Sequence, residues 1–271
     1  MRDRGVSLEV FFYNVAGGVF AGLLAGLFGV GGGLVIVPIL YHLLPAQGVA
    51  APLLMKVAIG TSLATIVVTS LSSAWSHYRK NAVDLAVLGA LSLGLLPGAI
   101  LAAVSARVLR NDFLVFFFVG FELLVAIQMG LALKVKPHRR LPRKRYQAGA
   151  GLVIGYLSGL VGIGGGTLSV PYLSWHNVPI KVAVGTSAAC GFPIALAGMT
   201  GFLLVGLSDP ASPPAASGYI LWPAFLAIVL GSVFAAPLGA KLAHRLSSPV
   251  LKRLFAVFLA LVAGKMLWSV V

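Results

Sequence analysis

Apolar residues fall into ten blocks separated by short polar or glycine-rich stretches. The blocks cover residues 8–29, 34–44, 53–76, 83–106 and 113–133, and then 146–162, 167–176, 180–207, 218–243 and 250–270. They lack the polar alternation of half-buried strands, and most could cross a hydrocarbon core about 30 Å thick as helices. The blocks 34–44 and 167–176 are too short to span alone. The pattern therefore predicts an all-α membrane protein.

Two motifs occur twice, in the same order. Residues 26–38 (GLFGVGGGLVIVP) match residues 159–171 (GLVGIGGGTLSVP) at an offset of 133 residues. Residues 56–62 (KVAIGTS) match residues 181–187 (KVAVGTS) at an offset of 125. Internal repetition of this kind indicates that the two halves share one fold. We therefore predict two repeats of about five helical segments each, with glycine-broken helices, re-entrant or discontinuous, near the start of each repeat.

The repeats predict three regions: a first transmembrane repeat at 1–133, a linker at 134–145 and a second transmembrane repeat at 146–271. If the first two blocks of each repeat form a hairpin, each repeat crosses three times and the second is inverted. This places 14 basic residues on the linker side and five on the other, against 11 and eight for parallel repeats. The positive-inside rule favours the inverted arrangement, with a cytoplasmic linker and both termini outside.

Composition agrees with a membrane protein. Apolar residues make up 59% of the 271 residues, and charged residues make up 10%, against about 25% in soluble proteins. The net charge of +14 could suggest nucleic acid, but seven of the 20 basic residues lie in the linker. A basic loop between apolar segments is typical of a cytoplasmic loop, so we expect no nucleic-acid partner.

The glycine clusters at 29–33 and 162–166 lack the βαβ context and the spacing of a dinucleotide-binding loop. They predict breaks from which new helices start near Leu34 and Leu168, with Pro38 and Pro171 near the first turn. Free N–H groups at such helix starts can bind an anion between the repeats. Close helix packing is the alternative. The candidate substrate-binding glycines are Gly31, Gly32, Gly33, Gly164, Gly165 and Gly166.

The second motif supplies further candidates. Lys56 and Lys181 each offer a point charge for an oxyanion, or extend their side chains to the lipid headgroups. The Gly-Thr-Ser trios that follow offer hydroxyl donors, or hydrogen bonds within and between helices. The trios comprise Gly60, Thr61, Ser62, Gly185, Thr186 and Ser187.

Glu122 is the only acidic residue well inside an apolar block. Buried acids in membranes are costly and often move protons, so Glu122 is a candidate for proton coupling, with a structural hydrogen bond as the alternative. The histidines lack the spacing of metal ligands, and no catalytic arrangement of polar residues is present in the sequence. We expect no metal, no cofactor and no enzyme activity.

The paired motifs G-x-x-G-x-G-G-G-x-x-x-V-P and K-x-A-x-G-T-S resemble those of the sulfite exporter TauE/SafE family, over nearly the whole chain. The resemblance implies a secondary transporter of the bacterial cytoplasmic membrane that moves small sulfur-containing anions, such as sulfite, sulfoacetate and related organosulfonates. One departure is Pro193, which follows Phe192 in the second half where the first half has Val67 and Val68.

These observations predict an exporter that works by alternating access around an anion site near the middle of the membrane. Its partners would be the small anion and membrane lipid. Two alternatives remain: an anion channel that uses the same site, and a membrane-embedded enzyme that acts on a lipid or a sulfonate.

Overall fold

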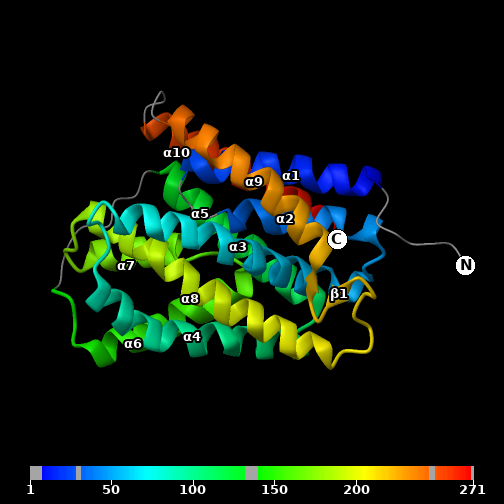
Figure 1. Cartoon of the computed structure of the whole chain (residues 1–271), viewed down its shortest axis with the longest axis horizontal. Helices are drawn as coiled ribbons and strands as arrows, with labels where there is room; N and C mark the ends of the chain where they lie inside the picture. The colour runs from blue at the N-terminus through cyan, green and yellow to red at the C-terminus, as the bar shows by residue number, and fades with distance from the viewer. Residues whose placement is uncertain (1–7, 29–31, 132–139, 244–247, 270–271) are drawn as a thin grey trace, which may run out of the picture.

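A computed structural model of the chain describes residues 8–28, 32–131, 140–243 and 248–269 (Figure 1). The first half contains α1 (Leu8–Phe28), α2 (Gly33–Leu43), α3 (Leu54–Tyr78), α4 (Leu85–Val108) and α5 (Asn111–Gly130). The one-turn 3₁₀ helices η1 (Pro45–Gln47) and η2 (Ala51–Leu53) connect α2 to α3.

The second half contains α6 (Lys144–Val161), α7 (Gly166–Trp175), α8 (Ile180–Leu207), α9 (Trp222–Ala243) and α10 (Ser248–Trp268). Between α8 and α9, the strands β1 (Ala216–Ser217) and β2 (Ile220–Leu221) form a small antiparallel hairpin. Within the described residues, each predicted block corresponds to one of these ten helices, and the all-α prediction is confirmed.

The predicted block 218–243 begins too early. Helix α9 starts at Trp222, and the apolar residues before it belong to the hairpin. Gly218 has a φ of 57°, which turns the chain between the two strands. The N–H of Leu221 then donates to the side chain of Thr61 rather than to a helical carbonyl group.

Six of the described helices are long and apolar enough to cross a membrane, by length and composition. These candidate spans are Glu9–Leu27, Ala51–Tyr78, Leu85–Val108, Asn111–Gly130, Ile180–Leu207 and Trp222–Gly239. The protein is therefore a multi-pass membrane protein.

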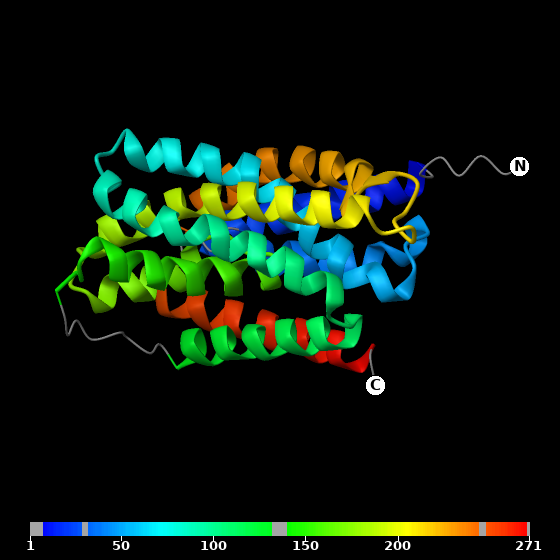
Figure 2. The same ribbon diagram turned by 90° about the horizontal axis from the view of Figure 1, so that it is seen from below.

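The helices run roughly along one direction and define two ends of the molecule (Figure 2). At one end, which we call the terminal end, α1 begins and α10 finishes (Figure 2). At the opposite end, which we call the linker end, α5 finishes and α6 begins (Figure 2). Both views place α2 and α7 as half-length helices that run from the interior toward different ends (Figures 1 and 2).

The first helix of each half packs most closely against a helix of the other half. Helix α1 of the first half packs along α9 of the second, and α6 of the second half packs along α4 of the first. Glycines allow both approaches: a Cβ at Gly22 would lie 2.6 Å from Cα of Ser232, and one at Gly155 would lie 2.8 Å from Cα of Leu95. Small residues commonly allow such close contact between membrane helices.

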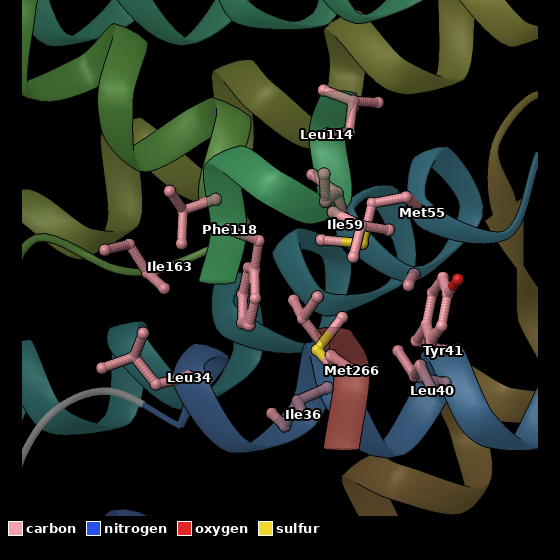
Figure 3. Close-up of a cluster of buried hydrophobic side chains, with 14 of the residues drawn as sticks. Leu34, Ile36, Leu40, Tyr41, Met55, Ile59, Leu114, Phe118, Ile163 and Met266 are labelled. Carbon is pink, nitrogen blue, oxygen red and sulfur yellow. The ribbon is translucent and has the colours of Figure 1, made fainter. Parts of the chain in front are cut away.

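The main apolar core surrounds α2 (Figure 3). Leu34, Ile36 and Leu40 of α2 are at most 3% exposed. Their neighbours in this cluster include Phe118 of α5 and Met266 of α10 (Figure 3). Helix α2 is therefore fixed on its sides by apolar packing, and its first turn lies deep inside the protein.

Candidate functional site

Each glycine cluster interrupts a helical hairpin. In the first half, Gly32 precedes α2 with a φ of 76°. In the second half, Gly162 ends α6 with a φ of 74°. A residue with a Cβ rarely adopts these angles, so glycine is required at both positions. The predicted interruptions are present, and Gly31 lies outside the described residues.

The prolines after the breaks do not lie where the sequence suggested. Pro38 and Pro171 lie inside α2 and α7 rather than in their first turns, because these helices begin earlier, at Gly33 and Gly166. A proline has no N–H to donate to the carbonyl group four residues before it. Each half-helix therefore has a weakened hydrogen-bond ladder close to its break.

Both breaks lie near the middle of the molecule. Helix α2 has 11 residues and α7 has 10. At 1.5 Å per residue these helices are about 16 and 15 Å long, which is half the thickness of a hydrocarbon core. Because α2 runs to the terminal end and α7 to the linker end, their first turns share the central zone (Figure 2).

The two breaks touch. A Cβ added to Gly33 would clash with the carbonyl oxygen of Gly162 and would lie 2.7 Å from Cα of Ile163. A Cβ on Gly162 would lie 2.9 Å from Val37 in α2 and 3.2 Å from Cα of Ile59 in α3. The sequence predicted that the two breaks share an anion site between the repeats, and in the structure the breaks are in direct contact.

Among the residues that the structure describes, no side chain caps either half-helix. Gly32 and Gly165 are the N-cap residues of α2 and α7, and no side-chain hydrogen bond is made at either position. The first N–H groups of a helix have no partner within the helix and carry partial positive charge. The centre of the molecule therefore contains two uncapped helix starts, the arrangement that suits an anion.

The first Gly-Thr-Ser trio lies against the β1–β2 hairpin of the other half. A Cβ on Gly60 would lie 2.5 Å from the carbonyl oxygen of Tyr219. The hydroxyl of Thr61 accepts a hydrogen bond from the backbone N–H of Leu221, at 3.0 Å. Gly60 and Thr61 thus attach the start of α9 to α3.

The second trio makes the same contacts in the opposite direction. A Cβ on Gly185 would clash with the carbonyl oxygen of Ala82. The hydroxyl of Thr186 accepts a hydrogen bond from the backbone N–H of Asp84, at 2.9 Å. Gly185 and Thr186 attach the start of α4 to α8, so both threonines join one half of the chain to the other.

The two serines of the trios differ. The hydroxyl of Ser62 donates to the carbonyl oxygen of Gly162 at 2.8 Å, which connects α3 to the second break. Ser187 is 0% exposed, and its hydroxyl has no hydrogen-bond partner among the described residues. Its backbone carbonyl oxygen faces the second break, 2.6 Å from where a Cβ on Gly165 would lie.

The two motif lysines are not brought together. Lys56 is 8% exposed, and its Nζ donates to the carbonyl oxygen of Arg107 at 2.9 Å and lies 5.9 Å from the ring centroid of Tyr219. Lys181 is exposed at the start of α8. Helix α3 starts at the terminal end and α8 at the linker end (Figure 2). One anion cannot contact both side chains in this arrangement.

Glu122 lies on the buried side of α5 and is 0% exposed. Neither of its carboxyl oxygens has a hydrogen-bond partner within the described part of the chain. Such a group is costly in an apolar interior, which is why buried acids in membranes usually have a function.

One polar contact was not predicted from the sequence. The hydroxyl of Tyr219 donates to Oδ2 of Asp209 at 2.6 Å, in the segment that joins α8 to α9. This bond, together with the N–H of Ala211, lowers the pKa of Asp209. Burial, and then the bond to Asp209, raise the pKa of Tyr219. The prolines between Asp209 and Gly218 were the only sequence sign of an ordered loop at this place.

The described residues contain no group of three or more His, Cys, Asp or Glu side chains that could hold a metal ion.

The described helices are those of a multi-pass membrane protein, in which the start of one half-helix packs against the break that precedes the other. The chain belongs to the sulfite exporter TauE/SafE family, which it matches over residues 14–266. This confirms the resemblance noted in the sequence.

Relatives of the chain are named as transporters. It is 37% identical over 261 residues to a probable membrane transporter protein of Haemophilus influenzae, covering 92% of this chain and 95% of the relative. It is 32% identical over 279 residues to the probable membrane transporter protein YunE of Bacillus subtilis, covering 96% and 98%. These names confirm the prediction of a transporter rather than an enzyme. No solved structure matches the chain.

Proposed function

We propose that the protein is a secondary transporter that exports small sulfur-containing anions, such as sulfite or organosulfonates, across the bacterial cytoplasmic membrane by alternating access. The observation that carries the proposal is the contact between Gly33 and Gly162, which brings the uncapped start of α2 against the break that precedes α7. The family name indicates the sulfur anion, and the helix starts supply the means of binding it.

The exchanged contacts support inverted repeats. Thr61 of the first half binds the start of α9, and Thr186 of the second half binds the start of α4. A two-fold axis in the membrane plane relates such contacts and also reverses the directions of α2 and α7. We therefore propose repeats at 1–133 and 146–271, joined by a cytoplasmic linker at 134–145, with both termini outside.

Alternating access requires the halves to move past each other around a fixed centre. The proposed site comprises the two glycine breaks, with the Gly-Thr-Ser trios as the joints that hold each half to the other. Lys56 and Lys181 lie at opposite ends of the molecule, so in this scheme each attracts anions at one entrance rather than in a shared site.

The energy source in this scheme is a proton or substrate gradient, because the sequence contains no nucleotide-binding motif. Glu122 is our candidate for proton coupling. Its burial and its lack of a hydrogen-bond partner among the described residues make it suited to take up and release a proton as its surroundings change.

A ligand screen tests the proposed substrate class. Purified protein is heated with sulfite, sulfoacetate, taurine, thiosulfate or sulfate, with chloride at equal ionic strength as the control. A ligand that binds only the folded state stabilises it by about 2.7 kcal/mol at 100 times its Kd. We expect sulfite or an organosulfonate to raise the Tm well above the chloride control. No shift with any sulfur anion would contradict the proposal.

A further inference from the structure

The hydroxyl groups around the two breaks are not used equally. Those of Thr61, Ser62 and Thr186 are all engaged in hydrogen bonds that connect one part of the backbone to another. The hydroxyl of Ser187, which the repeat makes equivalent to Ser62, has no partner in the described residues although it is fully buried.

The two half-helices also differ in the polarity of their first turns. Thr167 is the second residue of α7, and its Oγ1 is buried without a described partner. At the offset of 133 residues, the equivalent position in α2 is Leu34, which is 1% exposed in the apolar core near Ile163 (Figure 3). The start of α7 is therefore polar where the start of α2 is apolar.

A third free hydroxyl lies on the other side of the second break. Ser158 is 0% exposed near the end of α6, and its Oγ has no hydrogen-bond partner among the described residues. The repeat makes it equivalent to Ala25 in the first half. The second break thus has a serine where the first has only a methyl group.

Backbone contacts and the sequence place these three residues next to the second break. The carbonyl oxygen of Ser158 accepts hydrogen bonds from the N–H groups of Gly162 and Ile163. The carbonyl oxygen of Ser187 lies against Gly165, and Thr167 follows two residues later. Buried polar groups in proteins are nearly always hydrogen-bonded, so three free donors beside an uncapped helix start indicate a place for a ligand.

We propose that, within this central site, the second break supplies the polar groups that bind the substrate, while the first break supplies apolar packing. Its ligands are the hydroxyls of Ser158, Thr167 and Ser187 and the free N–H groups at the start of α7. This inference rests on the proposed transport function and assigns it to particular residues. All these donors are neutral, so the site suits a small oxyanion held by hydrogen bonds, without a lysine in contact with it. The first break then contributes only apolar packing to the contact between the two breaks.

Calorimetric titration with sulfite, and separately with methanesulfonate, tests the proposal. Ser187→Ala and Thr167→Val should each weaken the Kd by about 10-fold or more, the effect of losing one hydrogen bond to a charged group. Thr167→Ser keeps the hydroxyl and should retain affinity within about 2-fold, which separates a lost donor from a disturbed fold.

Thr200→Val is the control variant. Thr200 is exposed and its hydroxyl bonds only within its own helix, so sulfite affinity should stay within about 2-fold of wild type. If Ser187→Ala and Thr167→Val bind sulfite as tightly as wild type, or if Thr200→Val weakens binding equally, the assignment to the second break is wrong. No binding of either anion to the wild type would overturn the proposed substrate class as well.

Discussion

Gly33 packs directly on the backbone of Gly162, so the two glycine-broken hairpins meet although 128 residues lie between these positions. Neither position has room for a side chain, and Gly162 also has a positive φ. The contact explains one glycine of each cluster: Gly33 and Gly162 each leave room for the backbone of the other break.

Gly33→Ala should destabilise the protein. A methyl group would meet the backbone of the second break, and such overpacking costs about 1–3 kcal/mol or more. Thermal unfolding in detergent measures the effect. Gly120→Ala is the matched control, because a Cβ there meets nothing within 4 Å and alanine favours a helix. Equal Tm values for the two variants would show that the breaks do not pack as described.

Thr61→Val and Thr186→Val should each lose about 1–3 kcal/mol of stability, because the backbone N–H of Leu221 or Asp84 would lose its acceptor. Serine at either position keeps the hydroxyl and should recover most of the loss. Thr200→Val supplies a control, since Thr200 is exposed and its hydroxyl bonds only within its own helix. If both valine variants unfold like the Thr200 variant, the threonines do not join the halves.

The contact between Asp209 and Tyr219 should make stability depend on pH. The pKa of Asp209 is lowered in the folded state, so its stabilisation is complete above the unfolded value near 3.9 and is lost as pH falls through the lowered pKa. The pKa of Tyr219 is raised, so its contribution is complete below about pH 10 and is lost above it.

The Tm difference between wild type and Asp209→Asn, measured from pH 9 down to pH 2.5, reports this contact. We expect a constant advantage for the wild type between pH 5 and 9 that shrinks as pH falls below about 4. Tyr219→Phe should remove most of the same advantage. An advantage that is unchanged at pH 2.5 would mean that the ionised Asp209 does not hold the loop.

The topology can be measured with reporter fusions. A reporter inserted in the linker at position 138 should be cytoplasmic, and a reporter at the C-terminus should be outside, as three crossings per repeat require. Two cytoplasmic signals would instead support parallel repeats.

Glu122→Gln should leave sulfite binding nearly unchanged and abolish the response of transport to a pH gradient, because glutamine cannot exchange a proton. Calorimetry measures sulfite binding, and flux in proteoliposomes measures the response of transport to the pH gradient. Asp112→Asn is a control, since Asp112 pairs with Arg110 at the surface. If transport by the Glu122→Gln protein still responds to the pH gradient, Glu122 has a structural role instead.

The sequence predicted those features that depend on local chemistry. Glycine runs break helices and long apolar blocks form them, so Gly32 and Gly162 could be placed before any contact was known. The blocks matched the helices to within a few residues, except where Tyr219 and Leu221 enter a hairpin held by tertiary contacts.

Features that depend on tertiary contacts could not be predicted. The repeat suggested equal roles for Lys56 and Lys181, but they start helices at opposite ends of the molecule (Figure 2). The repeat also suggested equal roles for Ser62 and Ser187, although only Ser62 donates a hydrogen bond to an acceptor among the described residues. Which hydroxyl is engaged is decided by residues 100 or more positions away, and motif spacing contains no information about them.

Accumulation of radiolabelled sulfite in proteoliposomes under an imposed pH gradient tests the central claim most directly, with protein-free vesicles and vesicles containing Gly33→Ala as references. A secondary transporter should concentrate sulfite above its external level while the gradient lasts, and should release it when a protonophore is added. If sulfite only equilibrates across the membrane, the protein is an anion channel, and if it does not cross at all, the proposed function is wrong.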